Sequence, residues 1–421
     1  MKSIENIFNI RLQNPKLNTS YPLYPSDWEK YRVVENLLFA KNKELSFYIH
    51  IPFCRNLCTF CEYTRMKYPD EGVQNYYLDV IASDIHKFIS KHPDIVLRGF
   101  DIGGGTPTCL SEANFDRLIK IYQKVVSSLQ ISQDFESSIE GSFQTLSEKK
   151  LQLISRAGIN RISLGVQTSN RFVLSANKRS NTSMKIMYKW IKYAKSVGIH
   201  KINLDLMYGL KEQSVEEIKF DLALIALLKP EQITLYELRT NMLADVNYIS
   251  KEELFLFYNS FYNGLTSMSY HARFGQNTFS IDNSDYGVSS YMRSRMLEGL
   301  CYKGFGLSAQ SMSKFGISYN IGKNSISLLD NIKRSTYNEE FTYQLPKIEL
   351  LSKYIAISAY CGRFSLNIAS DIINENCIQY FKQQIDFCID QELMTLESNT
   401  LFITRKGYKN YGAVFSLFYL L

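Results

Sequence analysis

Short runs of apolar and β-branched residues alternate with amphipathic stretches between residue 45 and about residue 238. Each apolar run is seven to ten residues long, which is typical of a strand that is buried on both faces of a parallel sheet. We therefore predict six strands. They are LSFYIHI (45–51), LRGFDIGG (97–104), FESSIEG (135–141), NRISLGVQ (160–167), HKINLDLMYG (200–209) and EQITLYEL (231–238).

The segments between these runs place apolar residues at helical spacing. Gly158, Gly198 and Pro230 stand where such helices are expected to end. Six strand–helix units in tandem predict an α/β fold, and their similar spacing favours a partial (β/α)6 TIM-like barrel over a doubly wound sheet. The clearest helical segments are 76–88, 114–126, 148–158 and 215–228.

The remainder of the chain gives a weaker pattern. Residues 239–340 look irregular, apart from the glycine-bearing patch YKGFGLSAQSM (302–312). Residues 345–421 predict three helices and a short hairpin, LMTLESNTLFIT, in a winged-helix-like order. We therefore expect four parts. They are an N-terminal extension packed on the barrel (1–44), the core (45–240), a core extension that forms part of the substrate pocket (241–344) and a helical C-terminal domain (345–421).

Composition narrows the class of protein. The 421 residues are 45% hydrophobic and 21% charged, as in an ordinary globular protein. The net charge of +7 suits anionic small molecules, but the basic residues are dispersed, so we expect no nucleic-acid partner. The sequence shows neither a membrane-spanning run nor a signal peptide, which predicts a cytoplasmic protein without a membrane partner. The eight cysteines are then expected to be thiols or metal ligands.

Three of these cysteines, Cys54, Cys58 and Cys61, lie directly after the first predicted strand. In a parallel barrel this is the end where the chemistry takes place. Three thiolates fit an iron–sulfur cluster with one open iron. The alternative is a structural zinc site, whose fourth ligand would have to come from a single distant cysteine. The candidates are Cys109, Cys301, Cys361, Cys377 and Cys388.

The Cys-x3-Cys-x2-Cys spacing of CRNLCTFC resembles the signature of the radical S-adenosylmethionine (SAM) superfamily. The longer strings FYIHIPFCRNLCTFCEY (47–63) and DIGGGTPTCL (101–110) are similar to the branch named after oxygen-independent coproporphyrinogen III oxidase. Further likeness lies in NTSYP (18–22), RISLGVQ (161–167), INLDLMYGL (202–210) and GFGLSAQSM (304–312). The resemblance implies a [4Fe–4S] cluster on the three cysteines, with the methionine end of SAM as the fourth ligand.

The resemblance also implies residue roles. Tyr48 matches the tyrosine that reaches the SAM sulfonium, and Phe60 would pack on the adenine; the alternatives are a barrel-interior tyrosine and a core aromatic. The glycine loop would approach the amino-acid end of SAM, although such a triplet is usually only a tight turn. Asp205 needs a partner inside an apolar strand, where a structural salt bridge is the alternative. The implied cofactor contacts are Gly103, Gly104, Gly105, Thr106, Glu140, Gln167, Arg179, Asp205 and Gln310.

Two departures bear on the reaction. The oxidase branch has Cys-Gly-Cys where this chain has Cys61-Glu62-Tyr63, and the haem-chaperone motif is missing before GFG. We therefore expect a C-methyltransferase or other one-carbon tailoring enzyme that uses two SAM molecules and a flavodoxin- or ferredoxin-type electron donor on a small-molecule substrate. Tyr48 and Glu62 are the catalytic candidates. A tetrapyrrole oxidoreductase and a non-catalytic haem or cluster carrier remain open. The expected substrate contacts are Arg239, Arg273, Tyr286 and Gln310.

Overall fold

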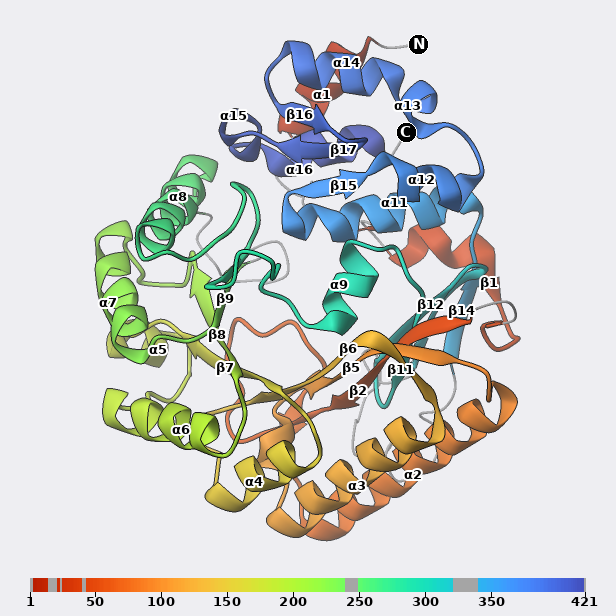
Figure 1. Ribbon diagram of the computed structural model, residues 1–421. Coiled ribbons are helices and arrows are strands. Elements are labelled where there is room, and N and C mark those ends of the chain that lie inside the picture. Colours follow the sequence, from red (N-terminus) through yellow and green to blue (C-terminus); the bar gives the residue numbers. More distant parts are fainter. Residues whose placement is uncertain are drawn as a thin grey trace.

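A computed structural model describes residues 3–13, 21–22, 25–39, 43–238, 249–320 and 340–419. The six predicted strands are present and pair in parallel, in chain order, within one twelve-stranded sheet (Figure 1). The α/β class with a partial barrel is thereby confirmed. These strands are β2 (Glu44–Ile51), β5 (Val96–Gly104), β6 (Gln130–Gly141), β7 (Arg161–Gln167), β8 (Lys201–Tyr208) and β9 (Gln232–Glu237).

Amphipathic helices cover the outer side of this sheet (Figure 1). In one of them, Ser111 caps the first turn by accepting a hydrogen bond from the Asn114 backbone N–H, and the buried face carries Phe115, Leu118 and Tyr122. Burial of each such side chain stabilises the fold by about 1.5–3 kcal/mol. The helices are α2 (Glu71–Lys91), α3 (Glu112–Ser128), α4 (Glu148–Arg156), α5 (Arg171–Ala176), α6 (Met184–Ser196) and α7 (Ile218–Leu228).

The described part of the segment predicted to be irregular contains two helices and five strands, separated by loops. Its strands extend the sheet at both edges: β11 pairs in parallel with β2, and β10 pairs antiparallel with β9. Strands of three to five residues leave too little periodicity to be seen in the sequence. The elements are α8 (Lys251–Ser267), β10 (Thr278–Ser280), α9 (Ser290–Met296), β11 (Tyr302–Phe305), β12 (Gln310–Ser313), β13 (Gly316–Asn320) and β14 (Glu340–Gln344).

The C-terminal part lies across one end of the barrel (Figure 1). Its predicted helices and hairpin are present, and the hairpin gains a third strand that the sequence did not reveal. The elements are α11 (Lys347–Ser358), β15 (Arg363–Ser365), α12 (Leu366–Ile373), α13 (Cys377–Tyr380), α14 (Lys382–Asp390), β16 (Met394–Glu397), β17 (Thr400–Ile403), α15 (Arg405–Tyr408) and α16 (Tyr411–Phe415).

The N-terminal extension contacts two distant parts of the chain. Its helix α1 (Ile4–Gln13) packs against α14 and α16, with the rings of Phe8 and Phe387 5.4 Å apart. The short strand β1 (Arg32–Val33) pairs with β14 at the outer edge of the sheet. The division of the chain into four parts stays a prediction.

Buried apolar side chains form one main cluster that extends from Leu37 to Tyr419 and includes both the barrel and the C-terminal part. Among the parts of the chain that the structure describes, none of the helices combines the length and the apolar character that crossing a bilayer requires.

Candidate functional site

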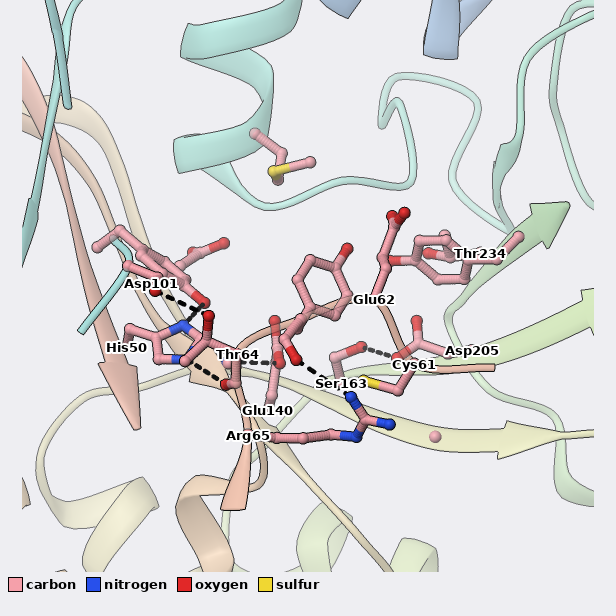
Figure 2. A pocket seen from close by; sticks show the side chains of 18 of the residues that line it. His50, Cys61, Glu62, Thr64, Arg65, Asp101, Glu140, Ser163, Asp205 and Thr234 are labelled. Atoms are coloured by element: carbon pink, nitrogen blue, oxygen red, sulfur yellow. Dashed lines mark hydrogen bonds between the residues drawn. The ribbon is translucent and has the colours of Figure 1, made fainter. Parts of the chain in front are cut away.

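A large pocket, about 1270 Å³ in volume, lies at the carboxyl ends of the parallel strands. Figure 2 shows Cys61 together with His50, Asp101, Glu140, Ser163 and Asp205 among the side chains that line the pocket. The wall of the pocket is formed by the barrel, the cysteine loop, α9, the strands β12 and β13, and α11. The predicted position of the site, at this end of the barrel, is therefore where the structure has its large pocket.

The three motif cysteines line this pocket together. Cys54 ends the short strand β3 (Phe53–Cys54), which pairs with β4 (Met66–Lys67), and Cys58 is equally buried, each 8% exposed. Burial raises the pKa of Cys54 to about 12, so the free thiol stays protonated at neutral pH and metal binding must displace that proton. Arg65 holds the loop by donating from Nη2 to the Cys58 carbonyl oxygen at 2.7 Å.

The positions of the other five cysteines bear on the zinc alternative. Cys109 also lines the pocket, whereas Cys301, Cys361, Cys377 and Cys388 are buried elsewhere in the core. Within the described residues, no three Cys, His, Asp or Glu side chains converge closely enough to ligate a single metal ion. In a four-iron cluster each thiolate binds a different iron, so its sulfurs stand farther apart than those around one ion. The three thiols facing one pocket fit such a cluster.

The glycine loop gives the cysteine loop room to pack. A Cβ atom on Gly105 would lie 2.8 Å from the Phe53 carbonyl oxygen, and one on Gly103 would lie 2.4 Å from Glu140 Oε1. The Gly104 N–H donates to Glu140 Oε2 at 3.1 Å, and the Gly105 N–H donates to the Ile51 carbonyl oxygen at 2.8 Å. Two of the amides expected to face SAM are thus engaged within the protein, and the glycines serve close packing.

Tyr48 and His50 share one face of β2, as the period of a strand predicts. His50 Nε2 lies 2.8 Å from the Thr64 carbonyl oxygen, and His50 Nδ1 lies 3.4 Å from the Tyr48 hydroxyl. Burial lowers the pKa of His50 to about 4, so the ring is neutral. The carbonyl requires a proton on Nε2, which leaves Nδ1 to accept from Tyr48. Tyr48 also stacks on Tyr291, with the ring centroids 5.6 Å apart.

Carboxyl groups from three strands of the barrel line the pocket. Asp205 accepts from Ser163 Oγ at 2.9 Å and from Asn203 Nδ2 at 2.8 Å, which confirms that it has partners; they are neutral groups rather than a salt bridge. Burial raises the pKa of Glu140 to about 7, and the neighbouring Asp205 adds to the shift. Burial likewise raises the pKa of Asp101 to about 7. At neutral pH each of the latter two is therefore near half protonation.

Asp101 and Arg161 line the pocket but were not predicted. Asp101 accepts from Ser289 Oγ at 2.6 Å, while its buried Oδ1 has no hydrogen-bond partner in the part of the chain that the structure describes. Arg161 donates to Gln232 Oε1 at 2.7 Å and to Ser138 Oγ at 2.8 Å. The available signal for both was a charged residue within an apolar strand run, and only Asp205 was predicted from that signal.

Three further predicted cofactor contacts line the pocket in different environments. Gln167 ends β7 with φ +71°, which is uncommon for a residue other than glycine, and its buried Oε1 has no partner among the described residues. Arg179 donates to the Gly165 carbonyl oxygen at 2.5 Å and lies 3.6 Å from Cys58 Sγ. Phe60 packs on a small apolar cluster beside Val173, Met207, Leu210 and Leu238.

The predicted catalytic and substrate residues divide into two groups. Glu62, next to Cys61, and Gln310 line the pocket. Arg273 and Tyr286 do not. Arg273 pairs with Glu397 and covers the Phe402 ring, and Tyr286 lies against Arg363, so both were wrongly predicted as substrate contacts. Arg239 and the loop that follows it lie outside the described residues.

Comparisons with known proteins agree with this geometry. Residues 48–225 match the Radical SAM superfamily. Oxygen-independent coproporphyrinogen III oxidase of Escherichia coli (strain K12) is 30% identical over 225 residues, which are 52% of this chain and 48% of that protein. Heme chaperone HemW of Bacillus subtilis (strain 168) is 32% identical over 194 residues, which are 46% of this chain and 50% of that protein. The matched part thus spans about half the length of these curated relatives.

The solved structure of coproporphyrinogen III oxidase from Escherichia coli shares the fold over a longer stretch. It superposes with a TM-score of 0.73 over 90% of each chain, at 22% sequence identity. The fold of the C-terminal part is therefore shared as well.

Proposed function

We propose that this protein, whose residues 48–225 match the Radical SAM superfamily, cleaves SAM reductively at a [4Fe–4S] cluster held by Cys54, Cys58 and Cys61. One observation carries the proposal: the three thiols line the same pocket as the polar side chains of Glu140, Gln167 and Asp205. When bound, such a cluster supplies one electron to SAM, which yields methionine and a 5′-deoxyadenosyl radical.

The chain's own residues provide binding groups for SAM. The unpartnered Oε1 of Gln167 is an acceptor for an N–H or O–H group. Glu140 and Asp205 offer carboxyl oxygens to ribose hydroxyls. Arg179, beside Cys58 Sγ, presents a guanidinium where a carboxylate could form a charge-assisted pair. The deep barrel interior excludes water from a reactive species.

We further propose that the radical serves a one-carbon transfer to a small-molecule substrate, with a second SAM as the donor. The size of the pocket supports this, since about 1270 Å³ exceeds the range of about 300–1,000 Å³ for single-ligand pockets. Glu62, which stands where the oxidase branch has glycine, would face that substrate. A flavodoxin- or ferredoxin-type protein is the proposed electron donor.

A second candidate is hydrogen abstraction from a tetrapyrrole. The extended fold similarity to coproporphyrinogen III oxidase, over 90% of each chain, favours it. This reaction would form 5′-deoxyadenosine without S-adenosylhomocysteine, whereas a transferase would form both. A haem or cluster carrier, the third possibility, would form neither.

The deciding experiment is anaerobic cluster reconstitution, reduction with dithionite in the presence of SAM, and product identification by mass spectrometry. We expect about four irons per chain and 5′-deoxyadenosine together with S-adenosylhomocysteine. Cys58→Ala should lose cluster iron and all 5′-deoxyadenosine, because Cys58 supplies one of three thiolates.

Cys109→Ala is the matched control, since Cys109 lines the same pocket outside the motif. It should keep both iron and product formation. A wild-type protein that binds zinc but not iron, or a Cys58→Ala variant that still forms 5′-deoxyadenosine, would contradict the cluster assignment. Equal loss in Cys109→Ala would make Cys109 a fourth ligand.

A further inference from the structure

We propose that Arg295, with Gln310 and Tyr319, forms a carboxylate-binding subsite in the pocket, beyond Tyr48 as seen from the cysteines. The inference rests on the proposed function in taking this pocket as the place where substrate binds. It deepens that function, because it assigns the chemical class of the group that the substrate presents to this end of the pocket.

The guanidinium of Arg295 is set up to receive an anion. It lines the pocket, donates from Nη2 to Gln310 Oε1 at 3.3 Å, and also hydrogen-bonds to the Tyr291 hydroxyl. Its Nε is buried without a partner, and no ion pair joins it to a carboxylate among the described residues. A largely buried cation without a counter-ion is costly, and a bound carboxylate would remove that cost.

Arg293, two residues earlier on α9, shows the contrast. It pairs with Asp134, and its Nε lies 3.0 Å from Glu298 Oε1, outside the large pocket. The two arginines share one short helix, yet among the described residues the arginine that lines the pocket is the one without an acidic partner. Arg293 is thus neutralised within the protein, whereas Arg295 remains able to pair with an anionic ligand.

Neighbouring side chains orient the subsite. Gln310 Oε1 accepts from the Tyr302 hydroxyl as well as from Arg295, and Gln310 Nε2 donates to the Tyr319 hydroxyl at 2.6 Å. Since the Tyr319 oxygen accepts that bond, its own proton is available to a ligand in the pocket. The Arg295 guanidinium lies 4.7 Å from the Tyr302 ring centroid, which fixes its plane.

The position of the subsite relates it to the reaction. Tyr291 stacks on Tyr48 on one side and contacts Tyr302 on the other, with ring centroids 5.9 Å apart in the second pair. A molecule whose carboxylate pairs with Arg295 would therefore extend along an aromatic wall toward Tyr48. The planar fork of arginine matches the two oxygens of a carboxylate, which a lysine at this position would bind only as a point charge.

The test compares two probes of the same shape on the cluster-reconstituted protein under anaerobic conditions. Naphthalene-2-carboxylate and naphthalene-2-carboxamide are titrated calorimetrically. We expect the wild type to bind the carboxylate at least tenfold more tightly than the amide. In Arg295→Gln the two probes should bind within twofold of each other, whereas Arg293→Gln should keep the tenfold preference.

Tyr319→Phe provides a second variant that keeps the ring and should reduce the preference only in part. Arg295→Lys should retain an intermediate preference. Equal binding of the two probes by the wild type, or a tenfold preference that survives in Arg295→Gln, would overturn the proposal.

The carboxylate could come from the substrate or from the methionine part of a second SAM, and equilibrium dialysis with SAM separates these sources. A fall from two SAM per chain to one in Arg295→Gln would assign the subsite to the second SAM. An unchanged SAM count with a lost probe preference would assign it to the substrate. These binding readouts do not need SAM cleavage, so a wild type that forms no 5′-deoxyadenosine would sink the proposed function and leave this test intact.

Discussion

The Thr64 carbonyl oxygen, at the end of the cysteine loop, accepts from His50 Nε2 and so makes His50 Nδ1 the acceptor for the Tyr48 hydroxyl. The cysteine loop is thereby linked through one neutral imidazole to Tyr48, which lines the pocket. His50 lines the pocket as well, and through its hydrogen bond it orients the Tyr48 hydroxyl.

Glu140 yields a prediction on pH dependence. Because burial raises its pKa from 4.5 to about 7, the carboxyl contributes stability that is fully present below pH 4.5 and is lost as the pH rises through 7. Glu140→Gln keeps an acceptor for the Gly104 N–H and removes the titration. We expect the wild type to lose more stability than the variant between pH 5 and pH 8, as measured by urea unfolding of ligand-free protein.

Glu112→Gln is the control with the opposite sign. The Ser147 hydroxyl and then Lys149 hold the pKa of the exposed Glu112 below its usual value, so its replacement should lower stability slightly at pH 8. An equal offset of Glu140→Gln at both pH values would mean that Glu140 is ionised throughout the range.

A functional residue could be predicted where the residues next to it in the sequence already indicate its role. The cysteines follow from spacing alone, and Asp205 from an acid in an apolar run. Arg295 could not be predicted from its sequence neighbours. Only the structure shows that Arg293, rather than Arg295, pairs with Asp134. Arg273 was wrongly predicted as a pocket residue because the sequence does not show that the C-terminal hairpin packs beside it.

At the level of elements, the packing of α9 on β5 determines the position of the Arg295 subsite. Gly99 of β5 has no side chain, and a Cβ atom there would lie 2.4 Å from the Tyr291 backbone nitrogen. The helix can therefore sit directly on the strand, which brings Tyr291 against Tyr48 and Arg295 to the pocket wall.

Gly99→Ala should push this helix outward. We expect a loss of about 1–3 kcal/mol in the free energy of unfolding, typical of overpacking, together with weaker binding of naphthalene-2-carboxylate. Gly72→Ala, near the start of α2, meets nothing closer than Asp70 Oδ1 at 3.1 Å and should change neither quantity. Unchanged unfolding of Gly99→Ala in thermal and urea experiments would show that α9 is not held by this contact.

The elements that could be predicted have enough residues to show a period, but length is not sufficient, since α8, with 17 residues, lies in the segment that was predicted to be irregular. Six strands with their helices, and the C-terminal helices and hairpin, met that condition. The strands β11 to β13 have four or five residues each, which is too short to show a strand period in the sequence. They form strands because they pair with neighbouring strands of the sheet. Tertiary pairing overrides weak local preference in such segments.

For the whole molecule, the main core cluster joins the barrel to the C-terminal part without a break. Tyr411 donates to Glu237 Oε1 at 2.8 Å, and the hydroxyls of Tyr208 and Tyr408 lie 3.3 Å apart, so the end of β9 is tied to the C-terminal helices. We expect one cooperative thermal transition in calorimetry, with near- and far-ultraviolet circular dichroism changing together. Two separated transitions would contradict a shared core.

The pairing of β11 with β2 also has a consequence during translation. β2 is made early, yet its neighbour on one side begins at Tyr302, and β1 finds its partner only in β14. During more than half of the synthesis of the chain, the nascent barrel therefore has an unpaired strand edge. Such an edge can pair with strands of other chains and cause aggregation. Slow codons or a holding chaperone would affect aggregation most while residues 52–301 are emerging from the ribosome, before β11 can pair with β2.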